Sequence, residues 1–292
     1  MPDVIKLVGA PQSPYSRKMR AALRYRRIPF QWVRQGSAAN QGQPQVKINS
    51  MIPVLWFCHE DSTQDTAMLD STFQLQHLEG LYTARSLQPA DPVVTFFDRL
   101  LEDFADEWLT KAMFHYRWSN PQDTKKAGTV LPLEARWDCS DEQVKGKQEA
   151  FAQRQVSRLG VVGSNDTTAP LIEESYKNVL CALNEILIQQ PFIMGHRPGA
   201  ADFAFFGQLA CLALFDPSSQ AVTLEYAPRV YAWVESMEDL SGDEVNTEDW
   251  VTRTNLPLKW SKLLKEVGRT YVPFLLGNAQ AVENKQEQVV CK

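Results

Sequence analysis

The chain has 292 residues, 44% of them hydrophobic and 22% charged, and a formal net charge of −5. This length and composition suit two domains with substantial buried cores. No basic stripe stands out, which argues against nucleic-acid binding, and no apolar run approaches the roughly 20 residues that a membrane-spanning helix needs.

The five cysteines are scattered, without CxxC or CxxH spacing. This pattern argues against a disulfide framework and against a structural zinc site. His59, His77 and His196 share no metal-ligand spacing either, so we expect no metal. The acidic start at residues 1–3 leads directly into an apolar run instead of a basic signal-peptide region, so we expect no secretory signal. A reducing cytoplasm is the simplest location.

Residues 1–85 alternate between short apolar runs and amphipathic helical patterns. The patterns predict strands over residues 4–8, 30–33, 54–58 and 64–69, helices over 14–27 and from 71 onward, and a loop or short helix over 36–45. The resulting β-α-β and β-β-α units predict an α/β domain in which helices cover the faces of a sheet.

Residues 86–92 contain two prolines and no periodicity, which indicates a linker. Beyond it nearly the whole chain has helical spacing. The spacing predicts helices over residues 93–116, 143–159, 171–189, 200–214, 231–237 and 256–276, the last bent at Gly268 and stopped near Pro273, with an irregular segment over 120–140. The 200–214 segment is apolar almost all round, so we expect a central buried helix, with Asp202 accepting backbone N–H bonds near its start.

Four segments, in this order, resemble the glutathione S-transferase family. They are Ser-Pro-Tyr-Ser at 13–16, Ile-Pro-Val-Leu at 52–55, Asp-Ser at 70–71, and Pro-Phe-Ile-Met-Gly-His-Arg-Pro-Gly-Ala-Ala-Asp-Phe at 191–203. The first resembles the glutaredoxin Cys-Pro-Tyr-Cys motif with both cysteines replaced by serine, as in serine-type transferases. The last resembles the signature of the family's helical domain.

The resemblance covers roughly residues 4–240 and implies an α/β thioredoxin-like N-terminal domain followed by an all-α helical domain. It implies a glutathione-binding domain over 1–85, a linker over 86–92 and a helical domain over 93–292. Residues 119–166 are longer than the family pattern and are treated as an insert, and residues 241–292 form a C-terminal extension. The family pattern also implies a homodimer, with the N-terminal domain of one subunit against the helical domain of the other.

The Ser-Pro-Tyr-Ser motif begins the first predicted helix. Ser13 suits the N-cap and Pro14 the first helical position, which is a sufficient structural reason for both residues. The resemblance implies a second role, because glutathione attacks as a thiolate and a free thiol has a pKa of about 8.5. A hydroxyl donor and the positive end of a helix both favour the thiolate. Ser13 is the main candidate for this catalytic role and Ser16 the alternative, with Tyr15 as the remaining hydroxyl among the glutathione-binding residues.

Serine at both cysteine positions has a direct chemical consequence. Glutathione cannot form a mixed disulfide with this motif, so glutaredoxin-like reduction and deglutathionylation through cysteine are not expected.

The segment before the third strand provides the next candidates. Ile52-Pro53 is acceptable as a simple strand entry, but the resemblance implies a cis bond, with the Ile52 backbone paired to the cysteinyl backbone of glutathione. Lys47 or Asn49 could reach the glycyl end, although a loop lysine is usually only solvated.

Asp70 and Ser71 begin the second predicted helix. With Gln74 they fit a capping box in which Ser71 is the N-cap. The resemblance implies that Ser71 also binds the γ-glutamyl carboxylate at this helix start, while Asp70 faces the γ-glutamyl ammonium. Both roles can coexist, because several N–H groups lack partners at a helix N-terminus.

The substrate pocket is expected between the domains, facing the first long helix. Its candidate lining residues are Trp108, His115 and Tyr116, with Met113, Arg117 and Trp118 nearby. An aromatic stripe at helical spacing is more often core than pocket, so the core alternative stays open.

The resemblance implies a cytoplasmic glutathione transferase-like enzyme that stabilises the glutathione thiolate for attack on a small hydrophobic electrophile. Glutathione would be a co-substrate, and no metal, nucleic acid or membrane would take part. Two alternatives remain open: a non-catalytic relative kept for partner binding or regulation, and a glutathione-dependent isomerase or peroxidase.

Overall fold

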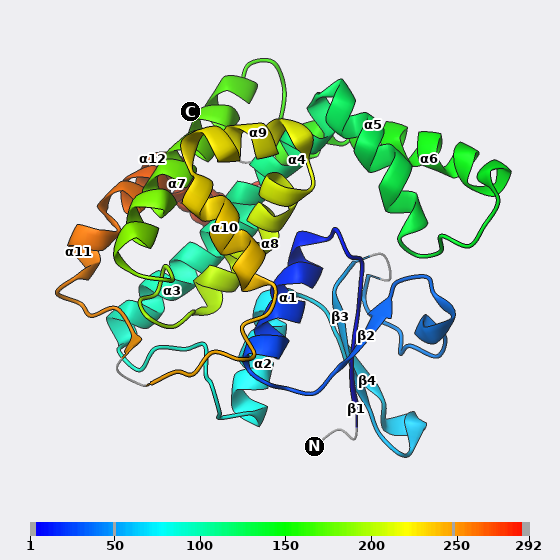
Figure 1. Cartoon of the computed structure of the whole chain (residues 1–292), viewed down its shortest axis with the longest axis horizontal. Helices are drawn as coiled ribbons and strands as arrows, with labels where there is room; N and C mark the ends of the chain where they lie inside the picture. The colour runs from blue at the N-terminus through cyan, green and yellow to red at the C-terminus, as the bar shows by residue number, and fades with distance from the viewer. Residues whose placement is uncertain (1–3, 49–50, 247–248, 288–292) are drawn as a thin grey trace.

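The computed structural model describes residues 4–48, 51–246 and 249–287, and it has an N-terminal α/β domain followed by a helical domain (Figure 1). The first domain comprises β1 (Val4–Gly9), α1 (Pro14–Tyr25), β2 (Gln31–Arg34), the short helix η1 (Ala38–Asn40), β3 (Val54–Cys58), η2 (Ser62–Gln64), β4 (Thr66–Met68) and α2 (Ser71–Leu81). The strands lie in the order β2-β1-β3-β4. β1 pairs with β2 in parallel and with β3 in antiparallel register, and β3 pairs with β4 in antiparallel register. The predicted two-domain fold class is confirmed.

The two faces of the sheet are covered differently. Ile5 and Leu7 belong to the main core, together with apolar residues of α1 and α2. Val8 and Trp56 lie in a separate, smaller core, and Val46 of the β2–β3 connection packs on it. Helices therefore cover one face, whereas a largely irregular segment covers the other, where we predicted helices on both. Because successive side chains of a strand point to opposite faces of the sheet, the same strands contribute to the main core and to the smaller core.

The helical domain accounts for most of the chain. It comprises α3 (Pro92–Asp103), a wider helical turn η3 (Phe104–Leu109), α4 (Thr110–Ser119), α5 (Pro121–Val130), η4 (Leu131–Leu133), α6 (Asp141–Val156), η5 (Leu159–Val162), α7 (Ala169–Gln189), α8 (Ala200–Leu214), α9 (Pro217–Tyr226), α10 (Pro228–Met237), α11 (Leu256–Lys259) and α12 (Ser261–Glu283). In the described part of the chain no single helix is long and apolar enough to cross a membrane, although α8 and α9, which meet at 106°, reach that length and composition together.

The central helix α8 has the predicted bounds and is buried along nearly its whole length. Asp202 accepts the N–H groups of Ile193, Met194 and Gly199, as predicted for a residue near the helix start. Gly207 lets α8 approach the first domain closely, because a Cβ there would lie 2.5 Å from the Pro14 carbonyl oxygen. α8 therefore supports α1 at its N-terminal end, where the Ser-Pro-Tyr-Ser motif lies.

The predictions for the helical domain missed two helices and placed one helix end wrongly. The segment predicted to be irregular contains α5, whose first residue is Pro121, and the sequence also contains α9, which was not predicted. Proline is common both in the first turn of a helix and at a break between helices, so a proline in the sequence does not distinguish a helix start from an irregular segment. The last helix continues through Pro273 to Glu283 instead of stopping there.

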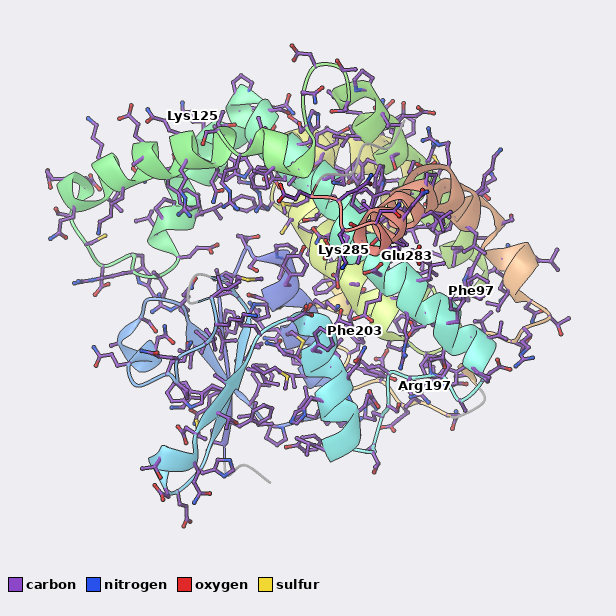
Figure 2. All side chains as sticks on the ribbon, turned by 180° about the vertical axis from the view of Figure 1, so that it is seen from behind. Phe97, Lys125, Arg197, Phe203, Glu283 and Lys285 are labelled. Carbon is purple, nitrogen blue, oxygen red and sulfur yellow. The ribbon has the colours of Figure 1, made fainter. Side chains whose placement is uncertain are left out.

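The C-terminal extension packs against the helical domain. Val251 donates its N–H to the Met194 carbonyl over 2.8 Å, and His196 donates to the Asp249 carbonyl over 2.7 Å. Trp260 is fully buried beside Phe97, and the Tyr271 hydroxyl donates to Asp103 Oδ2 over 2.6 Å. Figure 2 shows α12 beside α3, which carries the labelled Phe97. The extension therefore contributes to the core of the helical domain.

Candidate functional site

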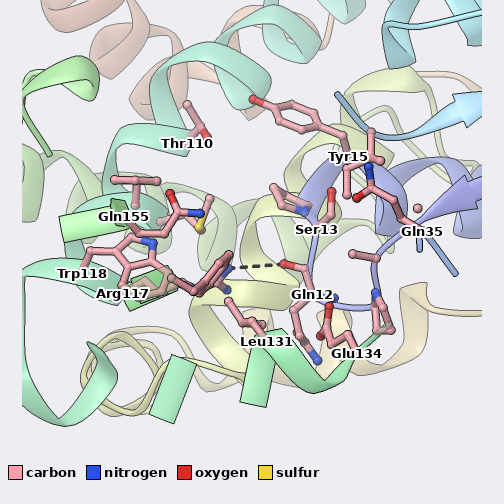
Figure 3. Close-up of a pocket in the computed structure, with 18 of the residues that line it drawn as sticks. Gln12, Ser13, Tyr15, Gln35, Thr110, Arg117, Trp118, Leu131, Glu134 and Gln155 are labelled. Carbon is pink, nitrogen blue, oxygen red and sulfur yellow. Dashed lines mark hydrogen bonds between the residues drawn. The ribbon is translucent and has the colours of Figure 1, made fainter. Parts of the chain in front are cut away.

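Two adjoining cavities lie between the domains. The larger, of about 710 Å³, is lined by the β1–α1 turn over residues 9–15, by α4, and by the insert. The smaller, of about 350 Å³, is lined by Ile52–Pro53, by the start of α2, and by residues of α3 and η3. Tyr15, Met51 and Ile52 line both cavities, so the two spaces meet at these residues. Figure 3 shows the larger cavity, with Ser13 and Gln155 on opposite sides.

Ser13 lies at the junction between the β1–α1 turn and α1. It is the N-cap of α1, as predicted, and its Oγ accepts the Ser16 N–H over 3.3 Å. The side chain is half-buried and lines the larger cavity. A hydroxyl that accepts one hydrogen bond still has its own hydrogen to donate. Ser13 can therefore donate to an anion at the positive end of α1.

The other two hydroxyls of the motif have different surroundings. Ser16 is fully buried, and its Oγ accepts the Ala10 N–H over 3.4 Å. It does not line either cavity. The Tyr15 hydroxyl donates to the Asp106 carbonyl over 2.8 Å, and burial raises the pKa of Tyr15 far above its ordinary value. Tyr15 lines both cavities, but its hydrogen is already bonded within the protein.

A buried ion cluster, which the sequence did not indicate, connects the helices that carry the candidate site residues. Lys18 of α1 is fully buried, and its Nζ lies 2.6 Å from both Glu102 Oε1 and Asp106 Oδ2. Thr72 of α2 donates to Glu102 Oε1 over 3.0 Å. Burial raises the pKa of Asp106 to about 6, partly offset by Lys18. The cluster therefore joins α1, α2 and α3 directly beneath the Ser13 and Ser71 ends of their helices.

The N-cap of α2 is Asp70 and not Ser71, so the predicted capping box is wrong. Asp70 has a φ of 72° and its Oδ1 accepts the Thr72 and Phe73 N–H groups over 3.0 and 3.4 Å. A carboxylate interacts with the helix N-terminus more strongly than a hydroxyl does. Gln74, the other half of that box, instead donates to the Pro53 and Met68 carbonyls. Asp70 and Ser71 both line the smaller cavity.

The Ile52–Pro53 peptide bond is cis, as predicted. Gln74 Nε2 donates to the Pro53 carbonyl over 2.9 Å, which links this segment to α2. Ile52 lines both cavities. Lys47 is exposed and lines neither cavity, and Asn49 falls outside the described residues.

The three aromatic candidates for the substrate pocket lie away from the larger cavity. Trp108 donates to Ser175 Oγ over 2.9 Å, His115 is bonded to Ser164 Oγ over 2.8 Å, and Tyr116 packs against Tyr176 with ring centroids 5.4 Å apart. Each therefore packs against or near α7. The wider turn η3 changes the helical phase between α3 and α4, and the regular spacing of apolar residues does not reveal such a change.

The opposite face of α4 lines the larger cavity, together with the insert. The lining residues from this region are Thr110, Met113, Phe114, Arg117, Trp118, Leu131, Glu134, Ala135, Phe151, Arg154, Gln155 and Arg158. The α4 members recur at three- and four-residue spacing, so they share one helix face. Met113, Arg117 and Trp118 were considered in the sequence, whereas the insert residues were not. The sequence predicted a helix over 143–159, but it did not predict that this helix lies across a cavity from Ser13.

Two hydrogen-bonded contacts fix the insert to the first domain. Arg34 of β2 donates to the Glu134 and Ala135 carbonyls, each over 3.0 Å. The Gln12 N–H donates to Glu134 Oε2 over 3.4 Å. Burial raises the pKa of Glu134 to about 7, against the effect of this hydrogen bond and of Arg117.

Arg117 is buried in the same wall and is compensated. Its guanidinium bonds the Asp216 carboxylate over 3.0 Å and donates to the Gln12 carbonyl over 3.3 Å, the latter drawn in Figure 3. Across the described residues, no three His, Cys, Asp or Glu side chains are grouped to hold a metal ion.

Comparison with known structures shows similar proteins at low identity. A Tau class glutathione S-transferase from mango, Mangifera indica, is 20% identical, with 90% of this chain and 100% of that chain covered and a TM-score of 0.44. A glutathione transferase family member from Pseudomonas fluorescens Pf-5, solved with two glutathione bound, is 19% identical over 82% and 94%, with a TM-score of 0.48. The beta-etherase LigF from Sphingobium sp. strain SYK-6 is 18% identical over 80% and 98%, with a TM-score of 0.49. Curated proteins gave no match.

Family models match the chain in both domains. The glutathione S-transferase N-terminal domain matches residues 7–86, and the glutathione S-transferase C-terminal domain matches residues 165–240. The two matches together span more than half of the chain and include the Ser-Pro-Tyr-Ser motif, the cis Ile52–Pro53 bond and Asp202. The chain belongs to the glutathione S-transferase family.

Proposed function

We propose that this protein is a cytoplasmic glutathione transferase in which Ser13 stabilises the thiolate of bound glutathione. Glutathione would occupy the smaller cavity, with its cysteinyl backbone at Ile52 and its γ-glutamyl end at Asp70 and Ser71. The sulfur would lie beside Ser13, facing the larger cavity. The thiolate would then attack an electrophilic carbon there, forming a carbon–sulfur bond as the leaving group departs with its electron pair. The thiol proton would pass to solvent.

One observation carries this proposal: the Ser13 hydroxyl, with its hydrogen free, lies at a helix N-terminus on the larger of two adjoining cavities. Neither cavity is filled by side chains of the protein, which favours a bound ligand over a fold kept only for partner binding. Each unit by which the thiol pKa falls favours the thiolate by about 1.4 kcal/mol.

Substitutions at Ser13 test the role of the hydroxyl. Ser13→Gly removes the hydroxyl at small cost to the cap, since glycine is a tolerated N-cap. We expect conjugation of 1-chloro-2,4-dinitrobenzene to fall at least about tenfold, while glutathione still binds by calorimetry. The ultraviolet absorbance of the bound thiolate should titrate at higher pH. Ser13→Thr keeps the hydroxyl and should restore most of the activity.

Ser16→Ala is the matched control, because Ser16 is buried away from both cavities. If conjugation activity is lost only in Ser16→Ala, the thiolate is stabilised one helical turn further along, at Ser16. No heat with glutathione would reject the proposal and favour a binding or regulatory protein. Turnover of a hydroperoxide without conjugation would favour the glutathione-dependent peroxidase.

We also propose a homodimer of the family type. Phe73 of α2 is 62% exposed and Phe96 of α3 is 59% exposed, so both domains present a large apolar side chain to solvent. Light scattering should give twice the mass of the chain, and a monomer mass would reject this proposal.

A further inference from the structure

One face of α6 and of the turn after it borders the larger cavity. Phe151, Arg154, Gln155 and Arg158 all line it. The spacing of three and four residues places Phe151, Arg154 and Gln155 on a single face of α6, and Arg158 follows in the turn after the helix. Two of these four side chains are arginines, so the insert presents two positive charges to a cavity whose other insert and α4 residues are largely apolar.

These two charges are not compensated within the described part of the chain. Neither Arg154 nor Arg158 forms an ion pair with a carboxylate there, and both side chains are exposed. Arg117, in the same wall, is different because Asp216 neutralises it. Glu134 is the remaining charged group of the lining, and its carboxylate accepts the Gln12 N–H.

The rest of the wall offers an apolar surface. Met113, Phe114 and Trp118 of α4 lie with Leu131 and Phe151 along the same cavity. Figure 3 shows Gln155, which directly follows Arg154 in the sequence, on the opposite side of the cavity from Ser13. A ligand that spans this cavity would therefore meet the thiolate at one end, apolar side chains in the middle and guanidinium groups at the other end.

We propose that the electrophile carries an acidic group, such as a carboxylate, which binds to Arg154 and Arg158. The inference rests on the proposed transferase function and names the class of its second substrate. A guanidinium forms paired hydrogen bonds with a carboxylate, which suits this recognition. The glycyl carboxylate of glutathione is a second source of the same group. The electrophile is favoured because the arginines belong to the helical wall and do not line the smaller cavity.

The experiment compares two electrophiles that share one reactive ring, one with a charged carboxylate and one with that group neutralised: 4-chloro-3,5-dinitrobenzoate and its methyl ester. In Arg154→Gln/Arg158→Gln, kcat/KM for the acid should fall about tenfold, while kcat/KM for the ester changes less than about twofold. The expected loss is modest because exposed ion pairs are weak and screened by salt. Lys145→Gln/Lys147→Gln removes two charges from α6 outside the cavity and is the matched control, which should leave both substrates unchanged.

Three results would overturn the inference. They are an equal loss of kcat/KM for acid and ester, no loss for either, or a raised KM for glutathione measured with the ester, which would assign the arginines to the glycyl carboxylate.

Turnover of the ester by the unmodified protein tests the transferase function separately. If no conjugation occurs at all, calorimetry with the unreactive 3,5-dinitrobenzoate and its methyl ester still decides. Tighter binding of the acid, lost in the double arginine variant, supports the site, and equal binding of acid and ester rejects it.

Discussion

Three hydroxyl groups within four residues differ in where their hydrogen atoms are directed. Tyr15 donates to a backbone carbonyl and Ser16 is buried under the β1–α1 turn, whereas Ser13 lines the cavity. Because Ser13 Oγ already accepts the Ser16 N–H, an approaching group meets the hydroxyl as a donor. Such a donor favours a thiolate over a thiol, and this preference is set by the cap itself.

Glu134 should make stability depend on pH in an unusual direction. Its pKa is about 7 in the folded protein, above the ordinary value of 4.5, because of burial. Between these values the folded protein keeps a proton that the unfolded chain has lost, so the stability contribution falls as pH rises from about 4.5 to about 7. Glu134→Gln should therefore gain stability relative to the unmodified protein on going from about pH 5 to about pH 8. Urea unfolding at the two pH values measures the difference, and a constant difference would contradict the assigned pKa.

At the scale of elements, the junction between the C-terminal extension and the loop before α8 depends on one glycine. Gly195 has a φ of 125°, and a Cβ there would lie 2.5 Å from the Asp249 carbonyl oxygen and 2.7 Å from the Val251 nitrogen. We expect Gly195→Ala to destabilise the protein by at least about 2 kcal/mol, because it combines backbone strain with backbone clashes. Chemical unfolding measures this loss. Gly242→Ala is the control, because nothing lies within 4 Å of a Cβ at that position, and an equal effect of both changes would contradict the argument.

Local signals predicted most elements, and long-range contacts explain the differences. Ser13, Pro14 and the apolar spacing of α1 are local, and the bounds of α8 followed from its apolar composition. The continuation of α12 through Pro273 could not be predicted from local signals, because a proline inside a helix costs about 3 kcal/mol. Burial of Tyr271 and its bond to Asp103 come from a helix far away in the sequence. Likewise, the residues facing Ser13 depend on the phase of η3 and on the position of the insert.

For the whole molecule, the buried Lys18 cluster joins the two domains. Lys18→Met would leave Glu102 and Asp106 buried without their cation, so we expect a loss of about 3–5 kcal/mol. Burial already raises the pKa of Asp106, and removing Lys18 takes away the charge that opposes this rise, which makes the loss larger at neutral than at acidic pH. Thermal and urea unfolding measure the effect. Adding Glu102→Gln and Asp106→Asn should recover much of the stability, and a loss below about 1 kcal/mol in the single variant would contradict the role of the cluster.

The larger cavity has walls from separate stretches of chain, and this division has a consequence for how the protein can change. Residues 9–15, which would handle the sulfur, lie entirely within one family match, while the arginine-bearing wall lies between the two matches. On the proposed function, substitutions confined to α6 would therefore alter which electrophiles are accepted without disturbing the cap of α1. New substrate preferences would then become accessible by changing one helix, with the proposed thiolate site at Ser13 left intact.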